Sequence, residues 1–344
     1  MKKLQRILAL FLVTVLLLSA LVSCGGYRPR KSSKKEASEV FTLGEDTVNF
    51  EVLYTFVRNR CEQIEGFTPA YFEGADGEAR FAAVLAEAER EIGEIYALFA
   101  LCREAGIDPE GDEVEDTLED YLTICVEGGQ INEYTLEGAG SYGAFLDTMA
   151  SNYSMNDAVV RLMLRVAICE NLLTTHYEDN LRYTDEDVRE FFESDDCIRI
   201  IWGSRPHSVM GFTSKENLEM MESIQHHFKT NQNGKAVQLS LNQTSDFYMG
   251  RNTKDRALYG ELIDVAFALP IGDTSEILDL GSEGYFVIKR LAKDSEDFDD
   301  RYRELVPVYI TEELYGDVEE KATENLEGIV YTDFYRALTV ADFF

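Results

Sequence analysis

Histidine and tryptophan are scarce in this chain of 344 residues, which has four of the first and one of the second. Imidazole chemistry therefore has few candidates. His226 and His227 are neighbours, and adjacent side chains on a helix point about 100° apart, which is typical of a solvated helix edge and not of a metal-ligand pair. Proline, with six residues, and glycine, with 24, are too few for a proline-rich or collagen-like chain.

Closely spaced cysteines are also missing, because the chain has no CxxC pair. Beyond Cys24, the cysteines are widely spaced, at Cys61, Cys102, Cys125, Cys169 and Cys197. Metal sites need ligands clustered at short spacing, and five is an odd number for a disulfide framework. We therefore expect no metal and no cofactor, and we interpret these five residues as mostly buried small apolar side chains.

Positive charge is low relative to negative charge. The chain carries 32 lysines and arginines against 64 aspartates and glutamates, a net charge of −32. Nucleic-acid binding needs a basic face, so this balance excludes a nucleic-acid partner. Hydrophobic residues make up 45% and aromatic residues 11% of the chain, which is enough to bury a core.

The first residues indicate the compartment. Lys2, Lys3 and Arg6 precede an apolar run over 7–20, which is shorter than the ~20 residues of a membrane-spanning helix. This layout predicts a secretory signal peptide over 1–23. The following Leu-Val-Ser-Cys, ending at Cys24, resembles the lipobox of bacterial lipoproteins. That resemblance implies a lipid on Cys24 and a location at the extracytoplasmic face of the cell membrane; the alternative is an ordinary signal peptide with a chance cysteine.

Residues 24–39 are interpreted as a tether between the membrane and the folded body. The part over 25–35 has no acidic residue and carries basic residues at Arg28, Arg30, Lys31, Lys34 and Lys35. Such a segment buries no core, so we expect it to be flexible, with its charges beside anionic lipid headgroups. Any polar linker would serve the same purpose, and that alternative stays open.

Residues 40–195 are predicted to form a mainly helical domain after a short hairpin over 40–48. Apolar residues recur at three and four residues over 78–105, and Gly106 ends that helix. Ser154 and Thr184, each with an aspartate three residues later, indicate two further helix starts. The expected helices cover 50–65, 78–105, 110–127, 142–150, 154–180 and 185–194, and we expect loops over 67–77 and 128–140.

The sequence period then changes. Residues 196–294 predict a small α+β domain with strands over 197–202, 236–241, 275–280 and 285–291 and helices over 213–231 and 260–269, the first capped by Thr213 with Glu216. Residues 295–344 predict a long helix whose apolar stripe needs a partner, which we expect to be the N-terminal helical domain. The predicted fold class is α+β: a mainly helical, chaperone-like domain built from both ends of the chain, with the smaller α+β domain inserted.

Residues 258–291 carry the clearest family resemblance. Ala266-Phe267-Ala268-Leu269 ends a helix, a Pro-Ile-Gly turn follows, and Gly284-Tyr285-Phe286-Val287-Ile288 begins the last strand. This order resembles the second half of a parvulin-type peptidyl-prolyl isomerase domain. The helical segments before residue 195 are similar to the N-terminal region of the SurA–PrsA group of extracytoplasmic foldases. The resemblance implies binding of unfolded or newly secreted polypeptides.

The residues expected at the isomerase site differ from the family pattern. The two histidine positions fall at Arg199 and Phe286, and the cysteine or aspartate position falls near Asn242. Leu258, Leu262 and Phe267 would supply an apolar wall for the prolyl ring, although plain core packing explains them too and is our preferred interpretation of Phe267. We expect Arg199 and Phe286 to face one concavity, where a guanidinium, which only donates, replaces an imidazole. We therefore predict weak or absent isomerase activity.

Three functions remain open at this point. The leading hypothesis is a membrane-anchored extracytoplasmic chaperone or foldase-like lipoprotein with a degenerate isomerase domain. The second is an active isomerase with a diverged site. The third is a non-catalytic envelope scaffold or solute-binding lipoprotein, because a fold by itself does not fix a function.

Overall fold

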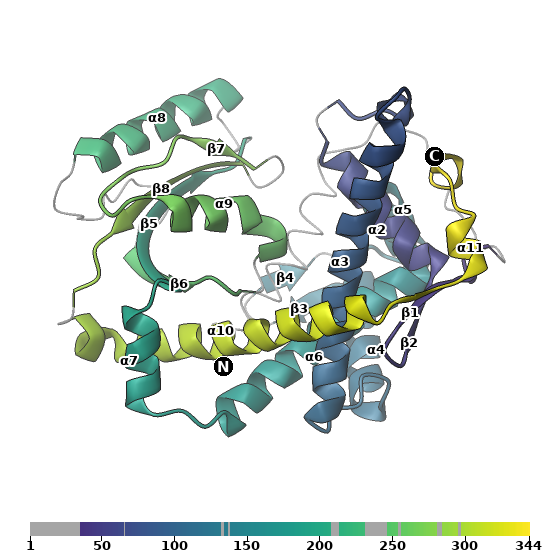
Figure 1. Ribbon diagram of the computed structural model, residues 1–344, viewed down its shortest axis with the longest axis horizontal. Coiled ribbons are helices and arrows are strands. Elements are labelled where there is room, and N and C mark those ends of the chain that lie inside the picture. Colours follow the sequence, from purple (N-terminus) through teal and green to yellow (C-terminus); the bar gives the residue numbers. More distant parts are fainter. Residues whose placement is uncertain are drawn as a thin grey trace. The chain divides into compact units, whose positions relative to one another are not determined.

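A computed structural model describes residues 35–64, 66–131, 134–136, 138–207, 213–230, 246–253, 256–280, 284–294 and 297–344. Helices dominate and antiparallel sheets make up the rest, which confirms the predicted α+β class (Figure 1). The chain forms two compact units, one from residues up to His176 with Val318–Phe344, the other from Tyr177–Asp317. The domain boundaries expected at 195 and 294 do not coincide with these divisions, and those boundaries remain predictions.

The first unit is mainly helical. It contains a sheet in the order β2-β1-β9 and a separate β3-β4 hairpin. Its strands are β1 (Glu39–Leu43), β2 (Asp46–Asn49), β3 (Gly129–Ile131), β4 (Tyr134–Leu136) and β9 (Val330–Tyr331). Its helices are α2 (Phe50–Glu62), α3 (Gly77–Glu104), α4 (Asp112–Glu127), α5 (Tyr142–Tyr153), α6 (Asp157–Asn180) and α11 (Asp333–Arg336), with short 3-10 turns at Pro69–Phe72 and Val340–Asp342. The β3-β4 hairpin lies where a loop was expected.

Of the two helix caps expected at Ser154 and Thr184, the structure confirms one. Thr184 caps α7 (Asp185–Glu193) in a reciprocal pair with Asp187, as expected. The prediction for Ser154 is wrong. It lies at the left-handed end of α5 with a φ of +56°, while the Asn156 side chain accepts the Val159 N–H at 3.0 Å and caps α6. The two capping residues are only two positions apart, so the sequence motif alone chose the wrong one.

Residues near 40–50 and the C-terminal residues meet in the first unit. Phe343 is 1% exposed, and its ring lies 5.3 Å from that of Phe50 and 5.6 Å from that of Phe81. β9 pairs with β1, so the last strand completes the first sheet. The apolar residues at the C-terminus therefore help to form a core begun near residue 40.

The second unit is built on a four-stranded antiparallel sheet in the order β6-β5-β8-β7. Its strands are β5 (Cys197–Arg205), β6 (Asp246–Gly250), β7 (Leu278–Asp279) and β8 (Tyr285–Leu291). Besides α7, its helices are α8 (Ser214–Thr230), α9 (Arg256–Ala268) and the first part of α10 (Asp297–Glu327). The strand expected over 236–241 lies outside the described residues.

Helices α8 and α9 cover opposite faces of this sheet (Figure 1). Side chains alternate along a strand, so Ile198 and Ile200 pack against α9 while Ile201 packs against α8. Gly203 lets α8 approach closely, because a Cβ at that position would lie 2.8 Å from the Ile224 side chain. Alternation thus gives each helix its own apolar layer.

Three basic residues at the end of β8 bind the C-terminal carbonyls of three helices. Lys289 Nζ donates to Phe228 O of α8 at 2.5 Å, and Arg290 Nη1 donates to Phe267 O and Leu269 O at the end of α9, both at 2.8 Å. Lys293 Nζ donates to Phe192 O and Ser194 O at the end of α7, each at 2.6 Å, and to Cys197 O at 2.8 Å. Cations at helix C-termini satisfy free carbonyls and the helix dipole, so this one segment fixes three helices to the sheet.

Among the residues that the structure describes, we find no helix with both the length and the hydropathy needed to span a membrane.

Candidate functional site

The side of the sheet under α9 contains the isomerase-like residues expected from the sequence. We call it the α9 face and define it by its buried and partly buried apolar members, Ile198, Ile200, Trp202, Phe247, Met249, Leu262, Val265, Ala266, Phe267, Leu269, Leu278, Leu280, Phe286 and Ile288. Six of these members are buried and form the core of this face: Ile198, Ile200, Leu262, Ala266, Phe286 and Ile288. The others are partly buried, so the contact surface that the face offers comes from them.

Three aromatic rings from three strands form the centre of the α9 face. The Trp202 ring lies 5.3 Å from Phe247 and 5.8 Å from Phe286. Phe286 is 4% exposed, whereas Trp202 and Phe247 are partly buried. Trp202 is the only tryptophan of the chain, and the sequence analysis did not single it out. The sequence does contain a signal for this position, because Trp202 alternates with Ile198 and Ile200 and side chains two apart in a strand share a face.

The predicted prolyl wall is only partly brought together here. Leu262 is fully buried in α9, and Phe267 is half-buried at the end of α9, where the Arg251 guanidinium lies 4.4 Å from its ring. Leu258 belongs to the first turn of α9. Asn242 lies outside the described residues.

Arg199 and Phe286 are not brought together. In the β5–β8 register Phe286 lies opposite Ser204, while Arg199 lies opposite Leu291. Phe286 belongs to the α9 face, and the alternation of β5 turns Arg199 away from it, because its neighbours Ile198 and Ile200 both point to α9. The expected shared concavity of these two residues is wrong. The residue beside Phe286 is Trp202, and a motif match does not reveal strand register.

Arg199 takes part in an ion-pair cluster at the start of β6. Its Nε donates to Asp246 Oδ2 at 2.8 Å, and Arg301 Nη1 lies 3.4 Å from the same oxygen. Both guanidinium groups lie over the Tyr248 ring, at 5.9 and 5.4 Å from its centre. Burial opposes ionisation of Asp246, but the two arginines outweigh it and hold the pKa of this carboxyl below its ordinary value. Arg199 is thus committed to a structural carboxylate.

Glu312 of α10 is the carboxyl with the most perturbed ionisation in this unit. It is 8% exposed, and burial raises its pKa to about 7. The Asn252 backbone N–H donates to Glu312 Oε2 at 2.8 Å, and a Cβ on Gly250 would lie 2.3 Å from the same oxygen. The carboxyl therefore occupies a notch that a glycine leaves at the end of β6. The sequence analysis did not single out Glu312.

His207 follows the end of β5 and was also not singled out by the sequence. Its Nε2 lies 2.8 Å from Asp279 Oδ1, and its ring centre lies 4.3 Å from that of Tyr285. Tyr285 packs with the layer under α8. This imidazole therefore belongs to the opposite side of the sheet from Trp202 and Phe286.

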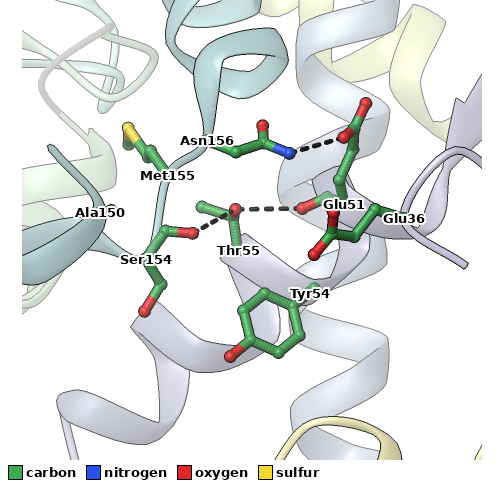
Figure 2. A pocket seen from close by; sticks show the side chains of 8 residues that line it. All are labelled: Glu36, Glu51, Tyr54, Thr55, Ala150, Ser154, Met155 and Asn156. Atoms are coloured by element: carbon green, nitrogen blue, oxygen red, sulfur yellow. Dashed lines mark hydrogen bonds between the residues drawn. The ribbon is translucent and has the colours of Figure 1, made fainter. Parts of the chain in front are cut away.

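A separate pocket lies in the first unit between α2 and the α5–α6 junction. It is lined by Glu36, Glu51, Tyr54, Thr55, Ala150, Ser154, Met155 and Asn156 (Figure 2). Asn156 Nδ2 donates to Glu51 Oε2 at 2.6 Å, and burial raises the pKa of Glu51. The volume is about 30 Å³, which is room for a water or two, whereas small-molecule sites measure roughly 300–1,000 Å³. This pocket is a polar joint between helices and does not fit a solute.

Within the described part of the chain, no three histidine, cysteine, aspartate or glutamate side chains form a group that could hold a metal ion.

Solved foldase structures are similar to this chain. PrsA from Bacillus subtilis is 15% identical with a TM-score of 0.26, over 73% of this chain and 87% of that one. The foldase PrsA from Streptococcus pneumoniae is 13% identical with a TM-score of 0.28, over 89% and 100%. A SurA-like chaperone structure from Campylobacter jejuni is 14% identical with a TM-score of 0.27, over 86% and 99%.

PrsA and SurA-like proteins make up the group that the helical segments before residue 195 resemble. No family model and no curated protein sequence matches the chain. Similarity of this size assigns no activity, so a function has to be argued from the residues.

Proposed function

We propose that this chain is a lipid-anchored, extracytoplasmic, foldase-like chaperone that binds unfolded secreted polypeptides, and that its isomerase-like domain has little or no isomerase activity. The observation that carries the proposal is the ring cluster of the α9 face, where the partly buried Trp202 and Phe247 meet the buried Phe286. Aromatic surface binds apolar segments of a client without needing a particular sequence.

The expected loss of isomerase activity follows from the chemistry of the twisted amide. Rotation about a prolyl bond has a barrier of ~20 kcal/mol and makes or breaks no covalent bond. A catalyst needs an apolar prolyl pocket and a polar network that stabilises the twisted amide better than the planar one. The α9 face offers apolar side chains for the first. For the second, Arg290 is bound to the Phe267 and Leu269 carbonyls and Arg199 points elsewhere and binds Asp246, so both guanidinium groups are already engaged.

The location rests on the sequence before the folded body. The signal-peptide pattern and the lipobox-like Leu-Val-Ser-Cys at Cys24 support export and anchoring, and the basic tether after it suits an anionic membrane surface. PrsA and SurA-like proteins are named as foldases and chaperones, which agrees with this proposal. The pocket near Glu51 is too small for a solute and does not favour a solute-binding lipoprotein.

Two solution assays test the proposal with the mature chain. In the first, suppression of aggregation of an unfolded client is measured for the parent chain, Trp202→Ala and Tyr285→Ala. We expect Trp202→Ala to lose most of the suppression and Tyr285→Ala, an aromatic on the α8 side, to retain it. Circular dichroism checks that both variants fold, and Trp202→Phe should keep most of the effect because it keeps a ring.

The second assay is refolding of a client limited by prolyl isomerisation. We expect no acceleration by the parent chain. Acceleration that disappears in Trp202→Ala would show an active isomerase and contradict the proposed loss. A chain that neither suppresses aggregation nor accelerates refolding would overturn the chaperone proposal in favour of a non-catalytic envelope protein.

A further inference from the structure

Two cysteines of the first unit lie against each other. Cys102 on α3 and Cys169 on α6 are both fully buried, and the Cys102 thiol donates to the Cys169 carbonyl oxygen with an Sγ–O distance of 3.6 Å. Interaction with Cys169 raises the pKa of the Cys102 thiol, and interaction with Cys102 lowers that of Cys169. The Cys102 sulfur therefore lies against the backbone of Cys169, although 67 positions separate the two residues in sequence.

The other cysteines of this unit provide a contrast. Cys61 and Cys125 are equally buried, and burial raises the pKa of each to about 11. At Cys169 the Cys102 hydrogen bond is the largest influence on the pKa, with Arg165 and Arg103 also favouring the thiolate. Only a thiolate attacks a disulfide, and in the folded unit these influences favour the thiolate at Cys169 over that at Cys102.

We propose that Cys102 and Cys169 form an intramolecular disulfide that joins α3 to α6 when the chain folds in an oxidising compartment. Because the Cys102 sulfur already lies against the Cys169 backbone, forming the bond requires the two side chains to turn toward each other. The extracytoplasmic location proposed above supplies the oxidant, while the chaperone activity plays no part in the inference.

The reaction balances with a disulfide oxidant, either a protein or a small-molecule disulfide. Either cysteine, as a thiolate, attacks one oxidant sulfur and releases the other as a thiolate, which leaves a mixed disulfide on that cysteine. The second cysteine then loses its proton, attacks the cysteine sulfur of the mixed disulfide and releases the second thiolate. Two protein thiols are oxidised, one disulfide is reduced, and their two protons pass to the released thiolates. Because both sulfurs are buried in the folded unit, the exchange occurs before α3 and α6 close.

The test refolds the mature chain from denaturant in a buffer of oxidised and reduced glutathione, with refolding in dithiothreitol as the reduced reference. We expect peptide mass spectrometry to find Cys102 linked to Cys169. We also expect the thermal midpoint of the oxidised chain to rise by about 5 °C over the reduced chain, because the bond closes a long loop in the unfolded state. Cys102→Ala and Cys169→Ala should lose the link and the shift, while Cys61→Ala and Cys125→Ala should keep both.

Three results would overturn the inference. One is a folded, oxidised chain in which Cys102 and Cys169 remain free thiols. Another is a link of either residue to Cys61 or Cys125 at comparable yield. The third is a shift in midpoint that persists in Cys102→Ala. The disulfide is detected by mass spectrometry, and the chaperone activity is measured by client aggregation. Either proposal can therefore fail while the other is still tested.

Discussion

Glu312 shows how one side chain can make the stability of a domain depend on pH. Its ordinary pKa is near 4.5, and burial raises it to about 7 in the folded state. The folded chain thus binds a proton that the unfolded chain has released between these two values. Stability linked to this group is present below pH 4.5 and is lost as the pH rises to 7.

We expect Glu312→Gln to remove this dependence. The amide keeps an oxygen for the Asn252 N–H and carries no charge. The free energy of unfolding of the parent should fall relative to the variant by about 2 kcal/mol between pH 4.5 and pH 7. Urea unfolding at several pH values measures the difference, and Glu320→Gln, exposed on the same helix, is the matched control. Parallel pH profiles of parent and Glu312→Gln would contradict the assignment.

Cys24 carries the proposed anchor at a single sulfur. We expect Cys24→Ala to leave the chain unprocessed by the lipoprotein pathway and without an acyl group, since the thioether needs the cysteine sulfur. Metabolic labelling with a fatty acid, together with mass spectrometry of the N-terminus, gives the result. Acylation of the variant at another residue would refute the lipobox interpretation.

At the scale of elements, the end of β8 shows how a short segment organises a domain. Lys289, Arg290 and Lys293 each neutralise the carbonyl end of a different helix, and three helices depend on one strand for their last turns. Burial lowers the pKa of Lys293, and its ammonium donates to three carbonyl oxygens. Its removal would leave those oxygens without this donor.

We predict that Lys293→Met destabilises the second unit by about 2–3 kcal/mol, because hydrogen bonds to a charged donor are among the strongest in a protein. Methionine keeps most of the apolar stem, so the loss reports the ammonium. Lys229→Met is a suitable comparison, since that lysine lies near the end of α8 and pairs with an exposed glutamate at 3.3 Å. Equal, small effects of both changes would argue against the capping role.

At the scale of the whole molecule, the two ends of the part that the structure describes depend on each other. The first unit takes its core from residues that begin near Val40 and from rings that end at Phe344. The last strand β9 pairs with β1, and Phe343 packs among rings of α2 and α3. Such a unit completes its core only after Phe343 has been made.

Phe343→Ala should therefore destabilise the first unit by about 3–4 kcal/mol, the usual effect of deleting a buried aromatic ring. Phe344→Ala, at a neighbouring ring that is 36% exposed, should cost much less. Thermal unfolding of both variants measures the contrast. Similar losses at the two positions would show that burial of Phe343 does not close the core.

The sequence by itself determined the features that depend on neighbouring residues. Periodicity and caps such as Thr184 with Asp187 located most helices, and alternation in β5 and β8 located the strands, because these signals act within one element. The α+β class and the resemblance to foldases came from the same patterns. Ser154 is an exception, because the residue that caps α6 is Asn156, two positions later.

Only the tertiary structure decided which residues meet. Strand register separated Arg199 from Phe286 and placed Trp202 beside it, although a motif match had paired the first two. Packing brought Cys102 to Cys169 and buried Glu312 in the notch at Gly250. Each of these contacts joins residues far apart in the chain, and their proximity depends on how whole elements pack, which no local pattern encodes.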